Sequence, residues 1–128
     1  MNCGTLYPFN LYIKAMSLLT RDLCQKLKDA GFEQKPIEQD FIYKGEDEEP
    51  MLVSDPKKIR KGTPYLRCPC LETMMKELKK VAGVVTVEMD DQVWVARPKD
   101  KEQFGDLVGM GAVRDAAAAM LWIAIKTA

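Results

Sequence analysis

The sequence contains no histidine. Histidine is the side chain that most often moves protons near neutral pH, and it is also the commonest metal ligand in proteins. Any catalysis by this chain would therefore rest on carboxylates, lysine, tyrosine or cysteine. The absence also removes the mixed cysteine and histidine ligand sets of many structural zinc sites.

An excess of charge of one sign is missing as well. The 19 Lys and Arg residues are balanced by 19 Asp and Glu residues, so the formal net charge is zero. Proteins that hold duplex nucleic acid through its phosphates usually carry a basic excess. We therefore expect no tight binding to generic duplex DNA at physiological salt.

The chain also lacks the apolar segments that direct or anchor a protein to membranes. Residues 1–5 do not start a basic region followed by an apolar run, so no secretory signal is evident. The most apolar stretch, residues 116–125, is shorter than the roughly 20 residues that span a bilayer. We expect a protein of the reducing cytoplasm, without membrane contact, whose four cysteines are free thiols: Cys3, Cys24, Cys68 and Cys70.

That same apolar stretch is the most informative part of the chain. Residues 116–125 carry no charged or strongly polar side chain, so a helix there has no wet face and belongs in the middle of a compact fold. Small side chains let a helix approach its neighbours closely. We therefore expect Ala118 or Ala119 to contact the sheet face that bears Val87 and Trp94.

An earlier amphipathic segment predicts a helix that ends at Ala30. Gly31 fits the left-handed position after its last turn, and Phe32 can fold back on that turn. The start of this helix is open. Either Thr20 is an N-cap and residues 5–16 form a separate element, which we favour, or one long helix runs from about residue 10.

A second helix is predicted from Cys68-Pro69-Cys70 to Gly83, with Pro69 at the first helical position. Residues 41–43 and 51–53 indicate two short strands, separated by an acidic turn. Residues 54–64 carry a basic run and are expected to form an exposed loop. The cations of this run are Lys57, Lys58, Arg60 and Lys61.

Residues 84–89 and 93–97 predict a β-hairpin, because both are rich in β-branched and aromatic residues. An even-length turn within residues 90–92 would place Val87, Met89 and Trp94 on one face, and we favour that register because a three-residue loop usually needs glycine. Residues 99–111 are expected to be a connector, with the terminal helix starting near residue 112. The predicted order of elements is α-β-β-α-β-β-α.

Cys68-x-Cys70 is the first candidate for chemistry, since two close thiolates can hold zinc or copper(I) or carry redox reactions. A structural zinc site needs four ligands at recognisable spacings, and Cys3 and Cys24 are too far apart to supply the second pair. We favour free thiols without metal. Cys70, at a helix start, is the thiol expected to react first with a probe.

Three further patterns are weaker. Gly109-Met110-Gly111 precedes a helix, but it lacks the adjoining strand and the third glycine of a dinucleotide fingerprint. The acidic run of residues 46–49 lacks the alternating ligands of a calcium loop. Four cations would form a basic spot beside Trp94 if they clustered, but acids are interspersed with them, and we favour a mixed solvated surface. Those cations are Arg97, Lys99, Lys101 and Arg114.

The arrangement from about Leu66 onward resembles small phage and prophage proteins of unknown function, some described as phage αβα-sandwich domains. Residues 84–97 look like their β-hairpin, and residues 115–125 look like their closing Ala-rich helix with tryptophan. The Cys-Pro-Cys start of the second helix departs from their pattern. The resemblance covers about half of the chain and implies a phage-related origin and a layered α+β fold. It carries over no catalytic residue.

The sequence thus predicts a single α+β domain over residues 1–128, with a small, mainly antiparallel sheet and a buried C-terminal helix packed on it. We assign no catalytic and no cofactor-binding residue, and expect no cofactor. The leading hypothesis is a non-enzymatic phage or prophage accessory protein that binds a protein partner in the host cytoplasm. The alternatives are a thiol-dependent or metal-binding protein using Cys68 and Cys70, and a small enzyme built from carboxylates and tyrosine. A homo-oligomer is compatible with each of these hypotheses.

Overall fold

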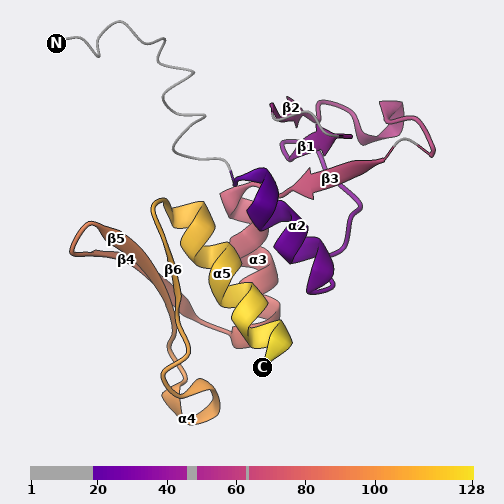
Figure 1. Cartoon of the computed structure of the whole chain (residues 1–128). Coiled ribbons are helices and arrows are strands. Elements are labelled where there is room, and N and C mark those ends of the chain that lie inside the picture. Colours follow the sequence, from indigo (N-terminus) through magenta and orange to yellow (C-terminus); the bar gives the residue numbers. More distant parts are fainter. Residues whose placement is uncertain (1–18, 46–48, 63) are drawn as a thin grey trace, which may run out of the picture.

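A computed structural model describes residues 19–45, 49–62 and 64–128. Three long helices lie between two small sheets (Figure 1). The helices are α2 (Arg21–Asp29), α3 (Leu71–Ala82) and α5 (Arg114–Thr127), with a short α4 (Lys101–Phe104) and a 3-10 turn η2 (Pro56–Lys58). The strands are β1 (Phe41–Lys44), β2 (Met51–Leu52), β3 (Tyr65–Cys68), β4 (Val85–Asp90), β5 (Val93–Pro98) and β6 (Gly109–Gly111).

The fold is α+β, as the sequence predicts, but its strands form two sheets rather than one. One sheet has the order β2-β1-β3 and the other the order β4-β5-β6, and every strand pair is antiparallel. Helix α5 packs on β5, β6 and α3, while α2 packs on β3 and α5. The helices therefore supply apolar surface to both sheets from the middle of the molecule.

The ends of α2 follow the signals in the sequence. Thr20 has an extended backbone, and its hydroxyl accepts a hydrogen bond from the Leu23 N–H at 3.2 Å, so the helix begins after Thr20. Gly31 has a φ of +98°, and the Phe32 N–H donates to the Leu27 carbonyl at 2.9 Å, which closes the helix in the expected left-handed cap. The predicted element at residues 5–16 lies outside the described residues.

The β4–β5 hairpin has the favoured even register. Asp90 pairs with Val93, which leaves Asp91 and Gln92 as a two-residue turn, and both have positive φ values of 49° and 70°. Met89 pairs with Trp94, so both side chains leave the same face of the sheet. Trp94 packs against the core to which α5 contributes, whereas Met89, nearer the turn, is 53% exposed.

The prediction that residues 99–111 form a connector is wrong in part. This segment contains α4 and also β6, the third strand of the sheet. Gly109 pairs with Ala96 and Gly111 with Trp94, so both glycines face α5. A Cβ atom on Gly109 would lie 2.2 Å from the Ala117 carbonyl oxygen. Strand and helix touch backbone to backbone there, which only glycine permits.

Helix α5 is buried nearly all round, as expected. From Asp115 to Ile125 no side chain is exposed, and Ala118 and Ala119 are completely buried. The backbone of Ala117 and Leu121 lies against Gly109 of β6. The contact of Ala118 or Ala119 with the sheet face that bears Val87 and Trp94 stays a prediction. Trp122 extends the core to α2, since its ring meets Phe32 edge-on at 5.0 Å.

Two other boundaries differ from the predictions. Residues 65–68 form β3, so Cys68 ends a strand instead of opening the second helix, because Leu66 and Cys68 pair with β1 and cover the core. That helix begins one residue after Cys70, its N-cap, so Pro69 precedes the helix instead of occupying its first position. It ends at Gly83, where φ is +71°, as predicted.

Candidate functional site

The two cysteines of the Cys68-x-Cys70 motif do not face a common site. Cys68 is completely buried, and its thiol donates to the Leu19 carbonyl at 3.8 Å. Cys70 is partly exposed, and its sulfur lies 3.3 Å from the Thr73 hydroxyl. Cys24, Cys68 and Cys70 are free thiols, and no group of three His, Cys, Asp or Glu side chains within the described ranges is arranged to hold a metal.

Burial raises the pKa values of two groups in the core, Cys24 and Tyr43. A hydrogen bond with Cys68, together with burial, raises the pKa of Cys24 far above its usual value. Burial likewise raises the pKa of Tyr43, whose hydroxyl donates to the Leu19 carbonyl at 2.7 Å. These groups remain protonated at neutral pH, and in that form they behave as parts of the core.

The other candidate patterns are distributed over the molecule. The Gly109-Met110-Gly111 segment is a strand packed on α5, so its glycines serve a close backbone contact. Most of the acidic run, at residues 46–48, lies outside the described residues. The basic spot is divided between two faces: the Arg114 guanidinium lies 5.5 Å from the Trp94 ring centre, whereas Arg97 leaves the opposite face of β5 and pairs with Asp90 at 3.4 Å.

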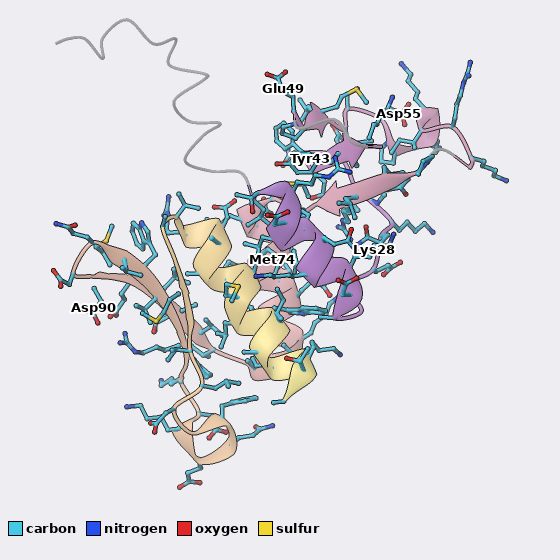
Figure 2. All side chains as sticks on the ribbon, viewed as in Figure 1. Lys28, Tyr43, Glu49, Asp55, Met74 and Asp90 are labelled. Carbon is cyan, nitrogen blue, oxygen red and sulfur yellow. The ribbon has the colours of Figure 1, made fainter. Side chains whose placement is uncertain are left out.

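A cleft of about 300 Å³ lies beside the sheet β2-β1-β3, and we call it the basic cleft. It is lined by Ile42, Lys44, residues 51–55 and residues 58–60. Figure 2 shows Asp55 at this outer end of the molecule, far from Asp90 at the tip of the β4–β5 hairpin. The cleft thus lies on the opposite side of the helical layer from the sheet β4-β5-β6.

The floor of the basic cleft is aliphatic, and its rim carries both exposed apolar and charged side chains. Ile42 and Val53 are 1% and 4% exposed, and Ile59 is half-buried. Met51 and Leu52 are 44% and 55% exposed. Exposed aliphatic side chains grouped beside a hollow are a common mark of a binding surface.

Cations surround this apolar floor. Lys44, Lys58 and Arg60 line the cleft, and Lys57 and Lys61 flank it on the same loop. The ion pairs formed within the described part of the chain are Asp40–Arg67, Glu72–Lys76, Glu77–Lys80 and Asp90–Arg97, so none of them uses a cation of this loop. Asp55 is the one carboxylate in the lining, and it accepts the Lys57 N–H as the cap of η2.

A buried polar cluster fixes the chain around the cleft. Asp40 is completely buried, and its carboxylate accepts hydrogen bonds from the Arg67 Nε at 2.7 Å, the Ile37 N–H at 3.1 Å, the Cys70 N–H at 3.2 Å and the Thr73 hydroxyl at 3.3 Å. Its carbonyl accepts the Val53 N–H at 2.8 Å. One residue therefore ties the first residues after β2 to β3 and to the start of α3.

Sequence reasoning treated the basic run as a solvated loop and did not single out Lys44, Asp40 or Arg67. Lys44 lies 14 positions before Lys58 in the chain, and only the pairing of β1 with β2 and β3 brings them to one cleft. The one available signal was the run itself, which places four cations within residues 57–61 of a chain without net charge.

Comparison of the chain with protein-family models, with curated proteins and with solved structures finds no match. None of the helices in the described ranges has the length and apolarity needed to cross a membrane.

Proposed function

We propose that this chain is a non-enzymatic module that binds a protein partner through the basic cleft. The observation that carries the proposal is the grouping of Lys44, Lys58 and Arg60, none paired with a described carboxylate, around an exposed aliphatic surface at Met51 and Leu52. Protein interfaces combine an apolar centre with a charged rim in this way. An origin in a phage or prophage and a role as an accessory protein belong to the same proposal, supported by the resemblance of residues 84–97 and 115–125.

A protein is a better partner than duplex DNA for two reasons. The basic cleft is local, while the charge of the whole chain is zero, so the long-range field that gathers DNA is weak. The hollow holds about 300 Å³, which suits one or two side chains and not the width of a duplex. A gel shift with generic duplex DNA at physiological salt should show no affinity below about 1 µM.

The proposal is tested by photocrosslinking in cells that produce the protein. A photoreactive residue at Leu52 should give a discrete crosslinked protein, whereas the same residue at Thr86, on the exposed side of β4, should not. The crosslink at Leu52 should disappear in a chain that carries Lys58→Glu and Arg60→Glu. Equal crosslinking from both positions, or a crosslink that ignores the charge reversal, would refute a cleft-specific protein partner.

A matched control uses Lys99→Glu with Lys101→Glu. Both lysines are exposed and lie at the other end of the fold, and the double substitution changes the net charge by the same amount. This variant should keep the crosslink at Leu52. If it loses the crosslink as fully as the cleft variant does, the partner senses total charge and the proposal fails.

A further inference from the structure

We infer that the partner segment taken by the basic cleft is an acidic, linear stretch of chain with one aliphatic side chain between its carboxylates. This inference rests on the proposed function and specifies its ligand. It follows from three properties of the cleft: the sign of its charge, the nature of its floor and its size.

The charge comes first. Lys44, Lys58 and Arg60 face the hollow, with Asp55 as the single carboxylate among the lining residues. The Asp55 carboxylate already caps η2 by accepting the Lys57 N–H at 3.0 Å. Bringing cations together without partners is unfavourable, and an incoming carboxylate relieves that repulsion while forming charge-assisted hydrogen bonds. The chemistry of the rim therefore selects an anionic ligand.

The floor selects the rest of the ligand. Ile42, Val53 and Ile59 present branched aliphatic groups, and the flexible Met51 side chain stands at the rim. A free phosphate has nothing to bury against such a surface. A leucine- or isoleucine-sized side chain does, and burying it removes apolar area from water on the ligand and on half-buried Ile59 and exposed Met51 and Leu52.

Nucleic acid fits this floor poorly. Sites for single strands stack the bases on aromatic side chains, and the residues that line the basic cleft include no aromatic one. The hollow of about 300 Å³ also matches a single anchor side chain with its flanking backbone. An acidic peptide satisfies the rim and the floor together, which neither a phosphate nor a nucleic acid does.

The experiment measures fluorescence anisotropy of labelled peptides of about ten residues with the full chain. The first peptide carries glutamates around a central leucine; the second replaces the leucine by serine; the third replaces the glutamates by glutamines. An oligothymidylate of equal charge is the fourth probe. We expect the first peptide to bind most tightly, with about tenfold weaker binding when either the leucine or the charge is removed.

Two variants locate the binding. Lys58→Glu with Arg60→Glu should weaken binding of the first peptide by at least about tenfold, and Lys99→Glu with Lys101→Glu should change it by less than about twofold. The inference is overturned if the oligothymidylate binds more tightly than the first peptide, if the serine peptide binds as well as the leucine peptide, or if no peptide binds. If the crosslink at Leu52 persists while the peptides fail, the proposed function stands and only this ligand class is refuted.

Discussion

The two sheets have the same number of strands and the same antiparallel pairing, yet they join the helical layer in different ways. The sheet β4-β5-β6 meets α5 through glycine and alanine, with a backbone contact at Gly109. Beside the sheet β2-β1-β3, buried Asp40 pairs with Arg67 of β3 and accepts hydrogen bonds from Cys70 and Thr73 at the start of α3. The contact of β6 with α5 requires a residue without a side chain at Gly109. The contact beside β3 requires that the buried Asp40 carboxylate be paired with Arg67.

This difference has a functional corollary. A backbone contact fixes β6 at one distance from α5 and leaves no room for a ligand. A polar cluster fixes loops instead, and the loops it holds around Val53 border the basic cleft. The candidate site therefore lies beside the sheet β2-β1-β3, where the hydrogen bonds of Asp40 hold the loop that borders the basic cleft.

The largest effect should come from breaking the polar junction. Asp40→Ala leaves the Arg67 guanidinium buried without its charge partner, and we expect a loss of about 3–5 kcal/mol in the free energy of unfolding. Replacing both residues, Asp40→Leu with Arg67→Met, removes the unpaired charge but leaves the Ile37 and Cys70 N–H groups and the Thr73 hydroxyl without their acceptor, so it should recover only part of that loss. Denaturant unfolding provides the measurement, and Asp90→Ala, in the exposed pair with Arg97, is the control at less than about 0.5 kcal/mol. A loss for Asp40→Ala as small as for the control would show that the pair does not hold this junction.

The glycine junction should be next. Gly109→Ala places a Cβ atom 2.2 Å from backbone atoms of Ala117 and Leu121, so strand and helix must separate. We expect a cost of about 3 kcal/mol in the same unfolding assay. Met110→Ala, at the neighbouring exposed position, should be nearly neutral. Equal stability of the two variants would mean that β6 does not approach α5 so closely.

A smaller change in stability is expected at Asp115, which is buried like Asp40 but lacks an ion-pair partner in the described chain. Asp115 is 5% exposed, and within the described chain no other residue donates a hydrogen bond to its carboxylate; burial raises its pKa from 3.8 to about 6. The folded state then binds more protons than the unfolded state between these values, so Asp115 lowers stability as the pH rises through that window. Asp115→Asn should stabilise the chain by about 2 kcal/mol near pH 7, and the difference should vanish below about pH 4.

Unfolding curves at several pH values provide the test. A gain for Asp115→Asn that is the same at low and neutral pH would show that the charge of Asp115 is not its cause. Asp22→Asn, at an exposed position in the first turn of α2, is the matched control and should show no such trend.

The smallest effect concerns the thiols. In a Cys3→Ser background, a thiol reagent should modify Cys70 in the folded protein, while Cys24 and Cys68 should react only after unfolding, because both are completely buried. Modification of Cys70 should leave the free energy of unfolding nearly unchanged. Three thiols that react at one rate in the native protein would contradict the placement of β3 on α2. One equivalent of zinc that is lost in a Cys68→Ser, Cys70→Ser chain would revive the metal hypothesis.

Much of the fold could be predicted because its signals are local. The Thr20 cap, the Gly31 cap and the register of the β4–β5 hairpin each depend on a few neighbouring residues. The all-round apolarity of residues 116–125 likewise predicts burial without reference to any partner. Such signals settle where elements start, end and turn.

The missed features depend on partners distant in the chain. β6 contains two glycines, which ordinarily disfavour a strand. The reason for them is the close approach of α5, which leaves no room for a Cβ atom at Gly109 or Gly111. Asp40 and Arg67 are 27 residues apart, and nothing in a single sequence pairs them. The basic cleft was missed for the same reason, since Lys44 and Arg60 belong to it only after the sheet β2-β1-β3 has formed.

The position of α5 between the two sheets also constrains the order of folding. The contacts of β6 with α5 join residues close in the chain, as do those within the β4–β5 hairpin, so this part can form quickly. Phe32 and the surrounding core of α2 must instead wait for Trp122, far along the chain. During synthesis, the segments up to β3 therefore leave the ribosome before the helix that completes their core. Their apolar surfaces stay exposed until α5 emerges, which makes that interval the stage at which a chaperone would bind this chain.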